Sequence, residues 1–202
     1  MSSRTQDASQ FRCEVVVPIR SFSGSKHRLA TVLNEAEREL LVERLASRVL
    51  SVCSSYPTIV VTSDPDVERF ATQFGSAIVA DPGSLNAAAD AGREFARRRG
   101  ADRVVILHAD LAHIVGIEAI ATCRDPGTVV AVADQRRDGT PAISVPTGAE
   151  FEFSYGPGSF ARHRKNALDA GLHFEVLLDD SLGFDIDLPE DLVAMLAKEQ
   201  SS

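Results

Sequence analysis

The sequence predicts a single-domain, three-layer α/β/α sandwich with a mainly parallel sheet, and two observations carry this prediction. Short, continuous runs of β-branched residues recur along the chain, which is typical of strands buried on both faces. Longer segments with the periodicity of amphipathic helices lie between these runs. Strands separated by helices need crossover connections, which place neighbouring strands parallel. A chain of 202 residues, 44% of them hydrophobic, can bury the core of such a fold without disulfides.

The strands are predicted from the β-branched runs, which are Cys13–Ile19, Thr58–Thr62, Arg103–Leu107 and Thr128–Val132. A further short strand, Pro141–Val145, is expected inside the stretch Ala133–Pro157. This stretch is rich in turn formers and is otherwise predicted to form loops. Long loops at strand ends are where open α/β sheets bind their ligands.

The helices are predicted from apolar stripes. The clearest stripe covers Glu35–Ser54, and Asn34 followed by Glu37 predicts a capping box at its start. The other predicted helices are Asp64–Phe74, Leu85–Arg99, Ile114–Cys123, Phe160–Ala170 and Pro189–Lys198. The sequence contains neither a Ser/Gly linker nor an internal repeat, so we expect one domain over 1–202, with 1–10 as a flexible segment.

Composition limits the function classes. The 29 acidic and 21 basic residues give a net charge of -8, which disfavours non-specific binding to nucleic acid. No apolar run approaches the ~18 residues of a membrane span, and the polar segment Met1–Gln10 resembles no secretory signal, so we expect a cytoplasmic protein. Cys13, Cys53 and Cys123 lie far apart in apolar segments, which favours buried free thiols. A polyanionic ligand would need local cationic groups or a divalent metal in this acidic chain.

The loop Arg20–Leu29, after the first predicted strand, is the first candidate binding segment. Gly24 and the serines around it allow backbone N–H groups to converge, and Arg20, Lys26 and Arg28 supply positive charge, so the loop could hold a triphosphate. The GxxxxGK[ST] spacing of a Walker loop is missing. A solvated Ser/Gly turn with surface charges is the alternative interpretation.

Asp110 is the second candidate, because it follows the buried run Val104–Leu107. A carboxylate at the carboxyl end of a strand faces the ligand crevice of a parallel sheet, where it could bind a hard cation. The alternative is that it caps a helix or closes a turn. His108 and His113 flank it, but no further ligand appears at a zinc-like spacing.

Asp185 and Asp187 are the third candidate. If Phe184–Asp187 is extended, both carboxylates point to one face, where they suit Mg²⁺ and its preference for oxygen ligands. Asp187 also fits as the capping residue of the helix that starts at Pro189, with Glu190 three residues on. The two roles are compatible, and Asp185 has no such structural alternative.

The fourth candidate is Tyr155–Lys165. The tight turn Gly156–Gly158 precedes Ser159, which is predicted to cap a helix whose free N–H groups form an anion site. The turn that begins at Arg162 adds four groups that are or could become cationic, although a capped surface helix with a basic face is the alternative. Thr140 offers a hydroxyl beside a flexible backbone.

Taken in order, the segments VVVPIRSFSGSKHRLATVL, DPGSLNAAADAG, VVILHADLA, VADQRRDGT, YGPGSFARH and DIDLPEDL resemble the guanylyltransferases that make the phosphodiester precursor of a deazaflavin redox coenzyme. The resemblance covers about Val15–Leu192, and its last two segments are the most specific. It implies a MobA-like, Rossmann-like nucleotidyltransferase fold. It also implies that GTP and Mg²⁺ are used to guanylylate 2-phospholactate, phosphoenolpyruvate or 3-phosphoglycerate, with release of pyrophosphate.

The resemblance also implies roles for individual residues. The expected metal ligands are Asp110, Asp185 and Asp187. The positions that match the acceptor site are Thr140, Gly156 and Ser159. The basic pair that faces the triphosphate is Lys26 and Arg28, and the segment near the nucleotide is Leu85 and Asn86. On chemical grounds we add, as substrate-binding residues, Arg20, Gly24 and Arg162.

The chain departs from the family pattern in two places. His108 and Ala112 replace the prolines around the strand-end aspartate, and Arg137–Pro141 replaces Gly-Thr-Gly-Thr-Asn. A related enzyme for another phosphorylated or phosphonate acid is therefore an alternative. A glycosyltransferase is a second alternative, because Asp185–Asp187 mimics the Asp-x-Asp motif of that class. A catalytically silent nucleotide-binding module is a third. We expect GTP and a small phosphorylated acid as ligands and no nucleic acid or membrane partner. A homodimer is compatible with the sequence.

Overall fold

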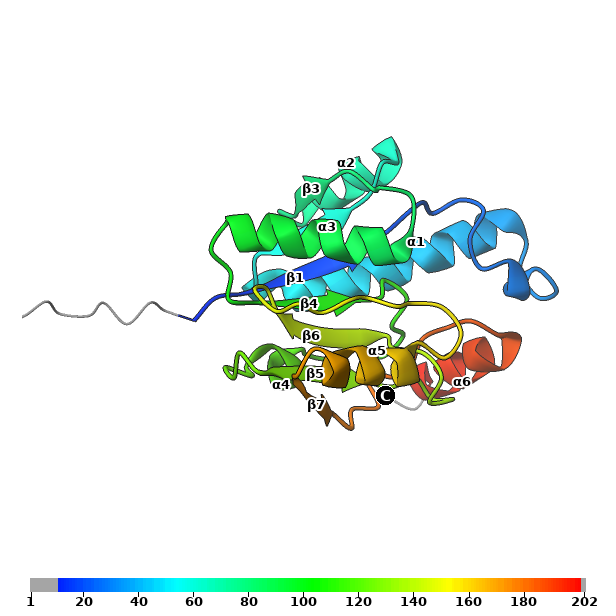
Figure 1. Cartoon of the computed structure of the whole chain (residues 1–202). Coiled ribbons are helices and arrows are strands. Elements are labelled where there is room, and N and C mark those ends of the chain that lie inside the picture. Colours follow the sequence, from blue (N-terminus) through cyan, green and yellow to red (C-terminus); the bar gives the residue numbers. More distant parts are fainter. Residues whose placement is uncertain (1–10, 201–202) are drawn as a thin grey trace, which may run out of the picture.

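The computed structural model describes residues 11–200, and the segment 1–10 that was expected to be flexible lies outside them. Within them the strands are β1 (Cys13–Pro18), β2 (Thr58–Val61), β3 (Ala77–Val79), β4 (Arg103–Leu107), β5 (Thr128–Val132), β6 (Ala142–Pro146) and β7 (His173–Val176). They form one sheet in the order β3-β2-β1-β4-β6-β5-β7 (Figure 1). β6 runs antiparallel to β4 and β5, and the other neighbouring pairs run parallel. The predicted mainly parallel sheet is confirmed.

Helices cover both faces of this sheet, as predicted. One face carries α1 (Glu35–Val52), α2 (Pro65–Gln73) and α4 (Glu118–Ala121). The other face carries α3 (Leu85–Arg98) and α5 (Ser159–Asp169). The last helix, α6 (Pro189–Glu199), packs against α1 through Met195, Leu41 and Leu45.

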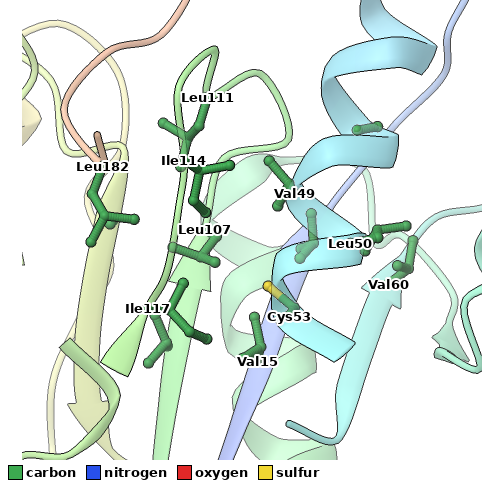
Figure 2. Close-up of a cluster of buried hydrophobic side chains, with 14 of the residues drawn as sticks. Val15, Val49, Leu50, Cys53, Val60, Leu107, Leu111, Ile114, Ile117 and Leu182 are labelled. Carbon is green, nitrogen blue, oxygen red and sulfur yellow. The ribbon is translucent and has the colours of Figure 1, made fainter. Parts of the chain in front are cut away.

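β1 explains why continuous apolar runs predict the central strands. Val15 and Val17 pack against α1, whereas Val16 packs on the opposite face with α3, and all three side chains are fully buried. Figure 2 shows Val15 beside Cys53 in the cluster under α1, which also contains Val49. A strand in this position has no polar face, so its sequence shows no alternation.

α3 approaches β1 more closely than an ordinary side chain allows. A Cβ atom on Gly92 would lie 2.3 Å from Cγ1 of Val16, so only glycine fits. This contact fixes the helix against the strand that leads to the first candidate loop.

The capping box predicted for α1 is confirmed, because the Asn34 side chain accepts the Glu37 N–H (3.0 Å) and Glu37 accepts the Asn34 N–H (2.8 Å). The helix predicted over Ile114–Cys123 is wrong for most of its length, since only α4 is helical. Its buried isoleucines, Ile114, Ile117 and Ile120, recur at every third position, and Gly116 weakens the first turn.

Two other predicted caps are wrong. Gly158, with φ of 71°, precedes α5, and Ser159 is the first helical residue. Leu188 rather than Asp187 precedes α6, and the carboxylate of Asp191 rather than Glu190 accepts the N–H groups of Asp187 (3.0 Å) and Leu188 (2.8 Å). At α5 the distant Asp138 accepts the N–H groups of Gly158 and Phe160, whereas at α6 the acceptor lies in the first turn of the helix itself.

The edge strands β3 and β7 were not predicted. They are short, and the side chains of β7 are mostly exposed, so neither forms a buried apolar run. Cys13 and Cys53 are buried as predicted, but Cys123 is partly exposed. No helix within residues 11–200 is long and apolar enough to cross a bilayer.

Candidate active site

The candidate site is a pocket of about 540 Å³ at the edge of the sheet where β1 and β4 end and β6 begins. Most of its lining comes from five segments, which are 18–28, 108–110, 138–140, 155–159 and the pair Asp185 and Asp187, and Val42, Leu85 and Asp134 complete it. Another hollow, beside β5 and β7, measures about 690 Å³. The chemistry of the lining, and not the volume, therefore distinguishes the site.

Lys26 is held in the middle of the acidic groups. Its backbone has φ of 54°, an unusual value for a residue other than glycine, and it precedes a short turn of 3₁₀ helix, His27–Leu29, whose Leu29 is fully buried. The ammonium donates to the carboxylate of Asp110 and, at 2.8 Å, to Oδ1 of Asp187. Burial lowers the pKa of Lys26, but the two carboxylates outweigh it and raise that pKa above its usual value. Lys26 is therefore charged.

The backbone sets Asp185 next to Asp110. Leu111 and Asp185 form an isolated antiparallel bridge, and Ala112 N–H donates to the carbonyl of Phe184 at 2.9 Å. Phe184 and Ile186 are buried in the cluster with α1 and α6. Residues far apart in the sequence thus meet at one pocket.

The aspartates carry more negative charge than Lys26 can balance. Burial, with the charges of Asp110 and Asp187, raises the pKa of Asp185 to about 7. Burial also raises the pKa of Asp110, but Lys26 and His108 outweigh it, so that pKa is lower than usual. Oδ1 of Asp110 and Oδ1 of Asp185 are buried and have no hydrogen-bond partner. Unpaired buried carboxylate oxygens are expensive unless a cation satisfies them.

This donor set fits a hard cation chemically, although its present arrangement does not form a coordination shell. Within residues 11–200, no group of three or more His, Cys, Asp or Glu side chains is placed to hold a metal ion. The ammonium of Lys26 lies between Asp110 and Asp187 and serves as their cation. The two unsatisfied oxygens are of the type that Mg²⁺ prefers, so magnesium stays a prediction.

Thr140 and Ser159 lie together in the lining of the same pocket. Their hydroxyl oxygens are 3.2 Å apart, and both residues are buried. Gly156, with φ of 109°, brings its backbone to the same wall. Asp138, which belongs to the altered loop, accepts the Gly158 N–H at 3.0 Å. Asp138 therefore uses part of the anion site that was predicted at the start of α5.

Only some of the other predicted site residues line the pocket. Arg20 and Arg28 line the pocket, and Arg20 pairs with Asp81 at 3.4 Å. Three predicted substrate-binding residues, Gly24, Asn86 and Arg162, do not belong to the pocket lining in the described part of the chain.

Two of these three residues, Arg162 and Asn86, hold the segment before α5 that lines the pocket. Arg162 donates to the carbonyl oxygens of Ser154 and Tyr155, so it holds the loop before α5. Asn86 accepts the Tyr155 N–H at 2.6 Å, and its neighbour Leu85 lines the pocket.

His163 is one of the four groups from Arg162 to Lys165 that were counted from the sequence as cationic or able to become so, but the structure places its ring in the interior. It is fully buried, and its Nδ1 lies 3.0 Å from Oγ1 of Thr140. The spacing of Ser159 and His163 was the available signal, because residues four apart share one face of a helix. His108 and Tyr155, with ring centroids 5.5 Å apart, also line the pocket.

Comparison with known proteins gives relatives over nearly the whole chain. A family model described as "Guanylyl transferase CofC like" matches residues 13–201. A phosphoenolpyruvate guanylyltransferase of Sphaerobacter thermophilus is 38% identical over 185 residues, which cover 88% of this chain and 89% of that protein. A 3-phospho-D-glycerate guanylyltransferase of Phenylobacterium zucineum is 33% identical and covers 89% and 88%. A 2-phospho-L-lactate guanylyltransferase of Haloterrigena turkmenica is 32% identical and covers 91% and 83%.

Solved structures support the fold. A protein of Desulfovibrio desulfuricans described as a nucleotide-diphospho-sugar transferase superposes with a TM-score of 0.78 and 15% identity, covering 96% of this chain and 90% of that one. A nucleotidyl transferase of a Methanothermobacter species gives a TM-score of 0.67 and 18% identity, covering 95% and 99%. At these identities the likeness concerns the fold alone, and it confirms the predicted nucleotidyltransferase architecture.

Proposed function

The chain belongs to the family of CofC-like guanylyl transferases, and we propose that it transfers GMP from GTP to the phosphate of a small phosphorylated acid and releases pyrophosphate. Relatives are named for phosphoenolpyruvate, 3-phosphoglycerate and 2-phospholactate, which define the acceptor class. The observation that carries the proposal is the meeting of Lys26 and the three aspartates with Thr140 and Ser159 around one pocket. The product would be a precursor of a deazaflavin coenzyme.

The reaction would proceed by in-line attack of an acceptor phosphate oxygen on the α-phosphorus of GTP. That oxygen is an anion at neutral pH, so no general base is required. Catalysis then depends on holding two mutually repelling anions together. Asp110, Asp185 and Asp187 would hold Mg²⁺, which supplies Lewis-acid neutralisation of phosphate charge.

The chain's own cations and hydroxyls complete the site. Lys26 and Arg28 line the pocket beside the aspartates, where they can pair with the phosphates of the leaving pyrophosphate. Thr140 and Ser159 can donate to the anionic oxygens of the acid, and the backbone at Gly156 allows close approach. These groups position the substrates without taking a proton from either of them.

The test is release of pyrophosphate from each of the four nucleoside triphosphates, with Mg²⁺ or with EDTA, against a panel of phosphorylated acids and phosphonates. We expect release only with GTP, Mg²⁺ and a phosphorylated acid, and a product mass equal to the acid plus GMP minus water. Release of a nucleoside diphosphate from nucleotide-sugars would instead favour a glycosyltransferase.

A catalytically silent nucleotide-binding module is the second candidate. It is favoured by the altered loop, since Asp138 occupies the N–H of Gly158 at the start of α5. Tight binding of Mg²⁺ and GTP without pyrophosphate release on any acid of the panel would support it.

A further inference from the structure

Both ring nitrogens of His163 are hydrogen-bonded inside the protein. The Ser154 N–H donates to Nε2 at 2.9 Å, and Nδ1 lies 3.0 Å from Oγ1 of Thr140. Aromatic rings surround the imidazole, with Tyr155 4.8 Å away centroid to centroid in an edge-on arrangement. No part of His163 is exposed, so it acts on a ligand only through its neighbours.

The backbone fixes the tautomer of this histidine. An amide N–H can only donate, so Nε2 must be the nitrogen without a proton. The proton of the neutral ring is then on Nδ1, which donates to Oγ1 of Thr140. Burial, reinforced by the charges of Arg162 and His108, lowers the pKa of His163 to about 4, so the ring is neutral at physiological pH.

This tautomer determines what the neighbouring hydroxyls offer to the pocket. Thr140 and Ser159 have two hydroxyl protons, and one of them is used in the hydrogen bond between the two oxygens. Because His163 donates to Thr140 and accepts nothing from it, the second proton is left over. Both residues line the pocket, so that proton is available to the pocket as a hydrogen-bond donor.

We propose that His163 is a positioning residue that makes the Thr140–Ser159 pair a donor toward an anionic oxygen of the acceptor acid. With the opposite tautomer, the Thr140 hydroxyl would donate to the ring and the Ser159 hydroxyl would donate to Thr140. Both protons would then be used, and the pair would present only lone pairs to the pocket. Such a surface would repel an anion. The inference rests on the proposed function, because it takes the acid as the ligand of this wall.

The test compares two substitutions that each keep one half of the imidazole. In His163→Asn the amide nitrogen can replace Nδ1 and still donate to Thr140. In His163→Gln the amide oxygen can replace Nε2 and still accept from Ser154, but the donor to Thr140 is lost. Nothing then keeps the Thr140 hydroxyl proton from turning away from the pocket toward the side-chain oxygen of the new residue. We expect Gln to raise the KM for the acid about 10- to 100-fold, Asn to raise it much less, and both to leave the KM for GTP within about twofold.

A structural role would give a different pattern. It would lower stability and raise both KM values in parallel, and a stronger defect in Asn than in Gln would also overturn the proposal. Thr140→Val added to His163→Gln should cost little beyond either single change, because both act through the Thr140 hydroxyl. Full additivity of the two changes would contradict the coupling.

Nitrogen NMR of histidine-labelled protein tests the proposal without any activity. We expect the His163 ring to show the Nδ1–H tautomer at pH 7, and the Nε2–H tautomer would overturn the inference. If the wild-type protein transfers GMP to none of the acids, the proposed function fails, whereas the tautomer is still measured. If it transfers GMP but Gln leaves the KM for the acid unchanged, only the positioning role fails.

Discussion

Nζ of Lys26 lies 2.8 Å from Oδ1 of Asp187, 161 positions away in the sequence, while it also bonds to Asp110. The ammonium thus bridges two of the three carboxylates that are the predicted metal ligands. It supplies the positive charge that keeps them together when no divalent cation is bound. The same side chain would be available to phosphate once another cation takes over that role.

Replacing Lys26 by Met should therefore destabilise the protein most when metal is absent. We expect a loss of about 1–3 kcal/mol in EDTA, between the values for exposed and buried ion pairs. Mg²⁺ should raise the melting temperature of Lys26→Met more than that of wild type, because it relieves the repulsion between the aspartates. Thermal unfolding in EDTA and in Mg²⁺ measures both effects.

Lys165→Met is the matched control, because Lys165 pairs with Asp169 on the exposed surface of α5. It should change neither stability nor the response to Mg²⁺. Equal responses of Lys26→Met and wild type to Mg²⁺ would contradict the bridging role of Lys26.

Substituting either of two aspartates by Asn should greatly reduce turnover. Removal of one close charge-stabilising group commonly costs about 10²–10³ in rate, so we expect at least that loss for Asp110→Asn and for Asp185→Asn. Steady-state pyrophosphate release over a range of Mg²⁺ concentrations measures it. Asp169→Asn, on the exposed end of α5, is the control, and near wild-type turnover in both site variants would reject the metal assignment.

Burial on both faces explains which parts of the fold the sequence predicts. β1 and β4 show the apolar runs Val15–Val17 and Val104–Leu107 because these residues are fully buried between the helix layers, whereas the exposed edge strand β7 shows none. Helix starts were harder to predict. Asn34 caps α1 as its spacing indicates, but at α5 the turn places Gly158 at the start, with a positive φ, and frees Ser159 for Thr140.

The site was predictable where it follows strand ends and unpredictable where it depends on loop conformation. Asp110 was placed from the end of β4 alone. The contact of Lys26 with Asp187 depends on a loop in which Lys26 is left-handed as well as Gly24, and no sequence pattern predicts that for a lysine. His163 was misjudged because a histidine beside arginines resembles a basic surface, whereas its ring lies in the core.

Asp185 should make stability in EDTA depend on pH. Its pKa is about 7 in the folded protein and near 4 in the unfolded chain, so between these values the folded state holds a proton that the unfolded state has lost. The contribution of Asp185 to stability therefore falls as pH rises from about 4 to 7. The free energy of unfolding of Asp185→Asn minus that of wild type should increase across this window and be constant above it.

Taking this difference removes the opposite effect of His163. Its lowered pKa makes stability fall as pH decreases from about 6.5 to 4, equally in both proteins. Chemical denaturation at several pH values provides the measurement. A difference that does not change between pH 4 and 7 would mean that Asp185 titrates normally.

Gly92→Ala should destabilise the protein although alanine is the better helix former. Helix propensity alone predicts a gain of up to about 1 kcal/mol. The new methyl group would, however, lie 2.3 Å from Cγ1 and 2.9 Å from Cγ2 of Val16, which is fully buried in the central strand and cannot turn away. Overpacking of this kind costs about 1–3 kcal/mol, so we expect a lower urea midpoint with an unchanged slope.

Gly148→Ala, where a Cβ meets nothing within 4 Å, should leave the midpoint nearly unchanged. Adding Val16→Ala to Gly92→Ala should cost less than it does in wild type, because it opens the space that the methyl needs. A midpoint of Gly92→Ala above that of wild type would show that α3 can move away from β1.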